Sequence, residues 1–353
     1  MGVRPARAPG PAAPLLFPLD IDSFAIGFDH RDRARLHALW DEILDAETWS
    51  EGRVVHAFEE SWTTWNGLPA VAFSGWTGAA LAALEFFGVR NGVVLCPSNT
   101  FMATPLAIQA AGGRVEFVDC NRGDLCMAFA DLERKIAQHR PRAVMLVHIG
   151  GHIAFDVERI ADLCRAEGIP LIEDCAHAHG SAWNGRRAGT WGDAGIWSFA
   201  ATKTISTGEG GMLVTRNSEL IDFARLFRNY GKPEYATRGL NYRMNEFTAA
   251  LGVVGVGRID EITAWKNAVA RERLDARHPH RVQLPDGMVS GFYKYIVFDP
   301  IERSTGKVYD APCHRIMGHD VDLPNSDWVA ENHWCVPLYY RPLSLLDQEA
   351  TVA

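Results

Sequence analysis

The stretch 143–177, AVMLVHIGGHIAFDVERIADLCRAEGIPLIEDCAH, decides the fold. Residues 143–147 form an apolar run of strand length, residues 157–167 repeat apolar side chains at helical spacing, and residues 170–172 form a second apolar strand. Apolar strands joined by a helix are typical of a parallel sheet that is buried on both faces. Acidic residues follow the second strand directly, and the carboxyl ends of such strands are where active-site residues are expected.

The same alternation continues on both sides of this stretch. Further apolar runs predict strands over residues 70–73, 93–96, 114–118, 194–199 and 211–215. Helical patterns cover residues 33–44, 54–65, 79–87, 104–111, 128–139, 218–230, 245–255 and 261–273. The sequence therefore predicts an α/β fold in which helices flank a mostly parallel central sheet. After the last helix, only the alternating strand 293–298 stands out among loops.

Composition argues against two classes of protein and favours one compartment. The formal net charge is −8 and the pI is about 5.9, which argues against a sequence-independent nucleic-acid binder. No apolar run approaches the ~18 residues of a membrane span, so the cytoplasm is the expected location. The seven cysteines are odd in number and lack the spacing of a metal knuckle, which favours buried free thiols. Residues 1–18, rich in Pro and Ala, are expected to form a flexible arm.

Three local features could serve one cofactor. Asp174, at the end of a buried strand, could pair with the ring nitrogen of pyridoxal phosphate, although such an acid is more often a helix cap or a metal ligand. Lys203 follows an apolar strand among small and hydroxyl residues, where partial desolvation would make it nucleophilic; a lone lysine is otherwise a surface residue. The turn Ser74–Gly78 before a helix could hold a phosphate through its backbone N–H groups.

The order and spacing of these features resemble the DegT/DnrJ/StrS family of pyridoxal-phosphate-dependent sugar aminotransferases, which have the type I, aspartate-aminotransferase-like fold. The resemblance runs from about residue 49 to residue 260. The motifs that carry it are Trp49-Ser50-Glu51-Gly52, Pro97-Ser98-Asn99-Thr100-Phe101-Met102-Ala103-Thr104, Glu173-Asp174, Ser198-Phe199, Lys203, Gly208 to Gly211, and Asn241-Tyr242-Arg243-Met244-Asn245-Glu246.

The resemblance implies three catalytic residues. Lys203 would be the Schiff-base lysine that also moves the proton, and Asp174 would pair with the pyridine nitrogen. His177 stands where the family usually has Gln, and would hydrogen-bond the phenolic oxygen of the cofactor. Its run, Ala176 to Gly180, is similar to one in 3-amino-5-hydroxybenzoate synthases; the alternative is a structural histidine.

The resemblance also implies how the cofactor is held. Phe101 would stack on the ring, unless it is a core residue, and Thr77, the backbone of Gly78 and Ser198 would bind the phosphate. Asn241 would reach the phosphate in the neighbouring subunit, so a homodimer with shared active sites is expected. Four other residues near these motifs are expected to have structural or packing roles and not catalytic ones: His148, His152, His179 and Cys175.

The chain departs from the family in two places. Trp76 replaces a small residue before Thr77, which would narrow the pocket or pack against the partner subunit. Between Phe298 and Val308 there is little room for the helix that relatives have, so the C-terminal α+β domain is expected to be small and trimmed. The predicted organisation is an arm over 1–18, a large cofactor-binding domain over 19–262 and a small domain over 263–353.

The expected function is transfer of an amino group from glutamate or glutamine to a keto-sugar, with a nucleotide-linked keto-deoxysugar as the acceptor and ping-pong kinetics. A cyclitol or aminoshikimate-type ring ketone is the alternative acceptor, suggested by His177. A sugar dehydratase is disfavoured because such relatives replace the lysine by histidine. A non-catalytic protein is disfavoured because Lys203, Asp174 and Ser198 are all present.

Overall fold

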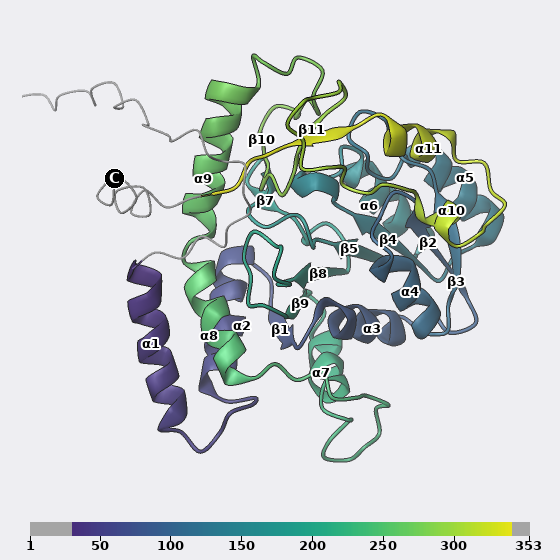
Figure 1. The fold of residues 1–353 in the computed structure, drawn as a ribbon. Coiled ribbons are helices and arrows are strands. Elements are labelled where there is room, and N and C mark those ends of the chain that lie inside the picture. The colour runs from purple at the N-terminus through teal and green to yellow at the C-terminus, as the bar shows by residue number, and fades with distance from the viewer. Residues whose placement is uncertain (1–29, 341–353) are drawn as a thin grey trace, which may run out of the picture.

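The predicted sheet is present and has seven strands in the order β1-β9-β8-β5-β4-β2-β3 (Figure 1). The computed structural model describes residues 30–340, so the predicted arm over residues 1–18 lies outside the described part. The strands are β1 (Ala70–Phe73), β2 (Val93–Pro97), β3 (Arg114–Val118), β4 (Ala143–Val147), β5 (Leu171–Asp174), β8 (Ala194–Ser198) and β9 (Gly211–Val214). Only β9 runs against the others among these seven, so the sheet is mostly parallel as expected.

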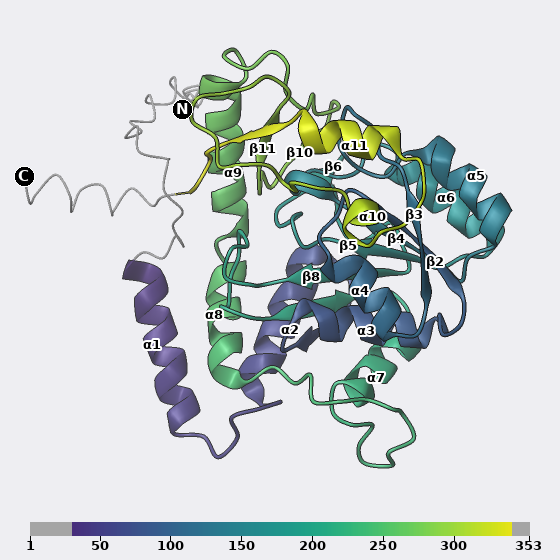
Figure 2. The same ribbon diagram turned by 45° about the vertical axis from the view of Figure 1, so that its right-hand side comes forward.

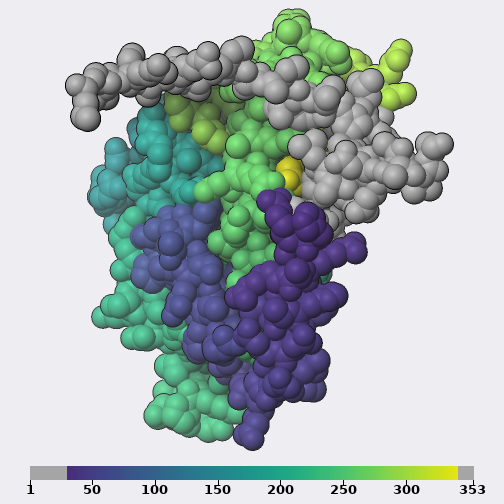
Figure 3. Space-filling model, turned by 90° about the vertical axis from the view of Figure 1, so that its left-hand side faces the viewer, coloured from purple at the N-terminus to yellow at the C-terminus, as the bar shows by residue number. Residues whose placement is uncertain are grey.

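Side chains that alternate along each strand enter two different cores. In β4, Val144 and Leu146 join one apolar cluster, whereas Ala143 and Met145 join another. The second cluster includes α3 (Trp76–Phe86), α4 (Ala103–Ala110) and α7 (Ser218–Phe227). The first includes α1 (His30–Leu44), α2 (Arg53–Asn66), α5 (Phe129–His139), α6 (Val157–Glu167) and α8 (Glu246–Val256). Helices thus cover both faces, which is the predicted α/β class, and α1 lies outermost along α8 (Figure 3).

The C-terminal region is small and packs onto the rest of the chain. It contains α9 (Ile259–Val269), the π-helical turn η2 (Ala270–Leu274), β10 (Met288–Val289), β11 (Tyr295–Val297), α10 (Cys313–Ile316), α11 (Pro324–Glu331) and β12 (Trp334–Val336). Strands β11 and β12 form a two-stranded sheet, and within the described residues no helix separates β11 from α10, which agrees with the trimmed region expected from the sequence. Helices α10 and α11 lie beside the carboxyl ends of β2 and β3, where the N–H of Cys313 donates to the carbonyl of Ser98 and the N–H of Ser326 donates to Asp119 (Figure 2). The predicted domain boundary at residue 262 falls within α9 and stays a prediction.

Small elements before α7 complete the fold. One is the short 3-10 helix η1 (Ile149–Gly151). The others are the strands β6 (Ala182–Trp183) and β7 (Arg186–Arg187), and these two strands form a three-stranded sheet with β10. None of the helices between residues 30 and 340 combines the length and the apolar character that a membrane crossing requires.

Helix α3 begins at Trp76, so the prediction that the turn extends to Gly78 is wrong. The glycine and hydroxyl residues of this stretch suggested a longer loop, but only Ser74 and Gly75 separate β1 from α3, and Gly75 precedes the helix with extended backbone angles of φ −171° and ψ 163°. Thr77 and Gly78 therefore lie in the first helical turn. The free N–H groups of that turn, which helices leave without backbone partners, lie beside the carboxyl ends of the strands.

Candidate active site

A cavity of about 530 Å³ lies at the carboxyl ends of the parallel strands. It brings together six of the eight residues that the sequence predicts for the site: Thr77, Phe101, Asp174, His177, Ser198 and Lys203. Gly78 and Asn241 are not among its lining residues. The carboxyl ends of β2, β5 and β8 and the start of α3 supply these side chains, so residues that are far apart in the sequence meet in one place.

Asp174, the last residue of β5, is a buried carboxylate at the floor of the cavity. Its Oδ1 accepts hydrogen bonds from the indole of Trp76 (3.1 Å) and the backbone N–H of Ala176 (3.0 Å). Its Oδ2 accepts from the hydroxyl of Thr104 (3.1 Å). Burial raises the pKa of Asp174, and these donors together with the nearby Lys203 act in the opposite direction. Two carboxylate oxygens offer about four acceptor sites, so room for one more donor remains.

Lys203 lies in the loop after β8, with its ammonium 4.7 Å from the ring centroid of Tyr293. Burial lowers the pKa of Lys203 from 10.5 to about 8, against the opposing attraction of Asp174. A substantial share of this side chain is therefore the neutral amine near neutral pH, which is the form that attacks a carbonyl carbon.

His177 lies flat against Tyr293, with ring centroids 4.0 Å apart and planes inclined by 19°. Its Nδ1 is buried and has no hydrogen-bond partner within residues 30–340. Burial and the ammonium of Lys203 hold the pKa of His177 well below its ordinary value, so the ring is neutral. A neutral imidazole that borders the cavity can donate or accept one hydrogen bond with a ligand.

The start of α3 and the adjoining loops form the polar wall of the cavity. The hydroxyls of Thr77 and Ser198 both border it. A Cβ on Gly78 would lie 2.8 Å from the Cβ of Tyr242, so a glycine is needed for this close packing. Phe101 is 65% exposed, which makes the core-residue alternative wrong.

Asn241 is exposed and does not reach the cavity of its own chain. Its Oδ1 accepts a long hydrogen bond from the backbone N–H of Arg243 (3.4 Å), and its backbone bridges to Asn229. Nearby apolar side chains are exposed as well, including Tyr235 (65%) and Leu240 (58%). This position agrees with the prediction that Asn241 acts on another subunit, which stays a prediction.

The sequence analysis missed the part of the site that comes from the C-terminal region. Tyr293, Lys294, Lys307 and Tyr309 line the cavity opposite Lys203. The alternating strand at 293–298 was visible in the sequence, but its pattern does not show which surface its first residues approach. The contact of Trp76 with Asp174 is also new and places the indole at the cavity wall, whereas the expectation that Trp76 narrows the pocket or packs against the partner subunit stays a prediction.

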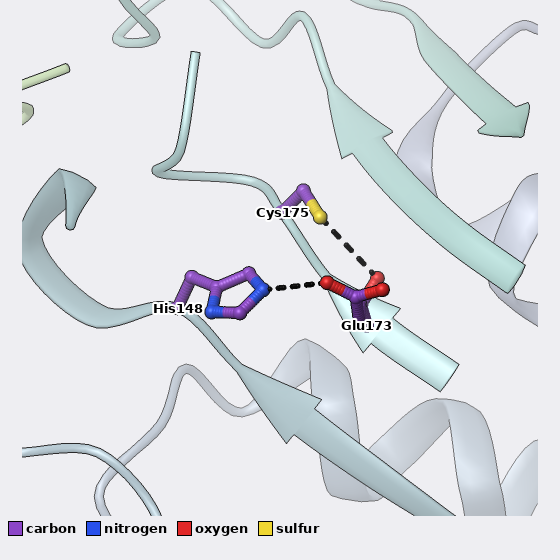
Figure 4. Close-up of side chains that lie close together, drawn as sticks. All are labelled: His148, Glu173 and Cys175. Carbon is purple, nitrogen blue, oxygen red and sulfur yellow. Dashed lines mark hydrogen bonds and ion pairs between the residues drawn. The ribbon is translucent and has the colours of Figure 1, made fainter. Parts of the chain in front are cut away.

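A second buried cluster, His148, Glu173 and Cys175, has ligand atoms close enough together to suggest a metal site (Figure 4). The hydrogen bonds argue for a structural role instead. Glu173 accepts backbone N–H groups of Gly189, Trp191 and Gly192 at 2.6–2.9 Å, and its Oε2 lies 2.9 Å from His148 Nε2. The other nitrogen of His148 accepts the N–H of Ala154. A metal ion would have to displace bonds that already satisfy these groups.

The two other histidines also have structural surroundings. His152 Nε2 lies 2.8 Å from the carbonyl oxygen of Asp124. His179 lies among the rings of Trp62, Trp197 and Phe199. Neither histidine lines the cavity.

The residues of the cavity fit pyridoxal phosphate. The free acceptor site on Asp174 suits a protonated ring nitrogen, and the neutral imidazole of His177 suits a phenolic oxygen. The N-terminus of α3 suits a phosphate, and the partly neutral Lys203 suits an aldehyde. With the mostly parallel sheet, this arrangement has the architecture of the type I fold of pyridoxal-phosphate-dependent transferases.

Comparison with known proteins gives the family. The model of the DegT/DnrJ/EryC1/StrS aminotransferase family matches residues 31–286. The chain is 34% identical to the dTDP-3-amino-3,4,6-trideoxy-alpha-D-glucose transaminase of Micromonospora megalomicea subsp. nigra, over 88% of this chain and 91% of that enzyme. The chain belongs to the DegT/DnrJ/EryC1/StrS aminotransferase family, which confirms the resemblance read from the sequence.

Two further relatives extend the comparison. The GDP-perosamine synthase of Escherichia coli O157:H7 is 35% identical, and the match spans 65% of this chain and 65% of that enzyme's length. The crystal structure of S. venezuelae DesV in complex with a ketimine intermediate superposes with a TM-score of 0.82 at 25% identity, covering 91% of this chain and 94% of that chain. The fold class expected from the sequence is thereby confirmed.

Proposed function

We propose that this chain is a pyridoxal-phosphate-dependent aminotransferase that moves an amino group from glutamate or glutamine to a nucleotide-linked keto-sugar. The observation that carries the proposal is the desolvated Lys203 beside the buried carboxylate of Asp174, in one cavity with the N-terminus of α3. The acceptor class is supported by the two relatives whose names specify sugar-nucleotide products.

Each residue has a distinct task in this proposal. The bound cofactor supplies a cationic ring that accepts electrons from the carbon bearing the amine. Asp174 binds the ring nitrogen and keeps it protonated, and His177 hydrogen-bonds the phenolic oxygen. Lys203 holds the cofactor between turnovers and then moves the proton. Phe101 covers one ring face and excludes water from it.

The phosphate is held by Thr77, the backbone of Gly78 and Ser198. This assignment is supported by the position of α3, whose first residues line the cavity and whose first turn leaves N–H groups without backbone partners. Asn241 contributes from the partner subunit, so the active unit is a homodimer. Mixing a Lys203→Met chain with an Asn241→Asp chain should restore activity to one site of each hybrid dimer. Absence of any recovery, with dimers present in sedimentation, would contradict the shared site.

Absorbance tests the cofactor assignment. The purified protein incubated with pyridoxal phosphate should turn yellow, and borohydride should fix the label on Lys203. Glutamate or glutamine should then bleach the colour, and a keto-sugar nucleotide should restore it. Labelling of another lysine would refute the site, and restoration by a cyclitol ketone alone would select the alternative acceptor.

A further inference from the structure

Lys294 brings a second ammonium group to the wall that faces Lys203. It follows Tyr293, and both ammonium groups lie over the ring of Tyr293, at 4.7 Å for Lys203 and 5.7 Å for Lys294. Both lysines line the cavity. The proximity has an electrostatic consequence, since the charge of Lys294 lowers the pKa of Lys203, His177 and the buried Lys266.

The other two lysines that line the cavity already have partners within the protein. Lys203 faces the carboxylate of Asp174. The ammonium of Lys307 donates hydrogen bonds to the carbonyl oxygens of Glu331 (2.7 Å) and His333 (3.0 Å). By contrast, the half-buried Lys294 makes no side-chain hydrogen bond or ion pair within residues 30–340. An ammonium at the cavity wall that has no such partner in this part of the chain is available to an anion bound there.

The position of Lys294 is fixed relative to Lys203. Its backbone N–H donates to the carbonyl of Gly150 (2.8 Å). The ammonium of Lys266 lies 3.0 Å from the carbonyl oxygen of Phe292 and 3.4 Å from the hydroxyl of Thr204, the residue after Lys203. The segment before Lys294 and the loop of Lys203 are therefore joined through one buried side chain, so the fold sets the spacing of the two backbone segments that carry these lysines.

We propose that Lys294 binds a carboxylate of the amino-acid donor. In an α-amino acid the carboxylate and the amine share one carbon, so an amine that reaches the place of the Lys203 nitrogen carries a carboxylate close beside it. The diphosphate of a sugar nucleotide is separated from the reacting carbon by the sugar ring, and belongs further out. This inference rests on the proposed function, and it assigns to Lys294 the recognition of the amino-acid donor in the first half-reaction of amino transfer.

The test separates binding from turnover. Glutarate, which is glutamate without its amine, is titrated by calorimetry into the protein loaded with pyridoxal phosphate and, separately, into the protein without it. Lys294→Met should weaken glutarate binding by about tenfold to a hundredfold, and Lys294→Arg should retain most of it. Lys307→Met is the matched control, since it removes the same charge from the same cavity but from an ammonium already bonded to carbonyls, and should cost less.

The outcomes are distinct. An equal loss of glutarate affinity in the two Met variants would show that only the total positive charge of the cavity matters, and would overturn the proposal. Unchanged glutarate binding in Lys294→Met would also overturn it. Loss of affinity for a nucleoside diphosphate, with glutarate unaffected, would assign Lys294 to the acceptor instead. Failure of the wild-type protein to take up pyridoxal phosphate would refute the proposed function, whereas the titration without cofactor would still decide what Lys294 binds.

Discussion

The lowered pKa of Lys203 predicts how capture of pyridoxal phosphate depends on pH. A lysine with a pKa of 10.5 is neutral in roughly one molecule in 3,000 at pH 7, whereas one with a pKa of about 8 is neutral in roughly one in ten. Burial therefore increases the reactive amine about 300-fold at this pH. The capture rate should rise with pH up to about 8 and then level off.

Replacing Asp174 by Asn tests the sign of this reasoning. The negative charge of Asp174 favours the charged ammonium, so its removal should lower the pKa of Lys203 further and move the midpoint of the profile to lower pH. Stopped-flow absorbance between about pH 6 and pH 10 would measure it, with N-α-acetyl-lysine as the reference for the ionisations of pyridoxal phosphate itself.

Two results would refute the reasoning about Lys203. One is a capture rate that climbs tenfold per pH unit up to about pH 10, as a solvated lysine would give. The other is a midpoint that stays in place or rises in Asp174→Asn. Lys203→Met should capture nothing, which confines the signal to this lysine.

Three further substitutions test the surrounding structure. Glu173→Gln should lower stability by about 3–5 kcal/mol, because it removes a buried charge that accepts several N–H groups; an unchanged melting temperature would contradict this. Gly78→Ala should cost about 1–3 kcal/mol in urea unfolding, and Tyr242→Ala in the same chain should recover part of it, since the new methyl would meet Tyr242. His177→Gln should retain the yellow colour. The activity of the variant and of the wild type should depend on pH in the same way near pH 6.5, because the pKa of His177 is already far below that value.

The sheet could be predicted from the sequence because burial on both faces leaves a simple mark, an unbroken apolar run, as in β4. The position of Asp174 followed from the same rule, since parallel strands present their carboxyl ends together. Predicting the role of Lys203 also required the order of the motifs, because the sequence around a single lysine does not show whether its side chain is desolvated. The start of α3 was misplaced because glycine and threonine propensities favour a turn, and packing of Trp76 against Asp174 overrides them.

The C-terminal residues could not be predicted for a different physical reason. Tyr293 and Lys294 reach the cavity through long-range contacts, such as the bond from the Lys294 N–H to Gly150. A period-two pattern shows which side chains share a face of a strand, but not what that face approaches. One wall of the cavity is formed by the ends of the strands, and the other is formed by C-terminal residues that long-range contacts bring there. Only the first wall could be predicted from the sequence.

The pKa shifts of Lys203 and Asp174 show what the cavity is built to receive. In an isolated ion pair each partner stabilises the other's charge, so the pKa of the acid falls and that of the lysine rises. Here the acid is raised and the lysine is lowered, because desolvation outweighs their mutual attraction. Each is thus shifted toward its neutral form. A ligand that brings a cationic nitrogen to Asp174 favours the charged carboxylate, and an electrophilic carbon at Lys203 reacts with the neutral amine. An aldehyde on a pyridinium ring would do both, and the N-terminus of α3 would suit a phosphate on the same ring.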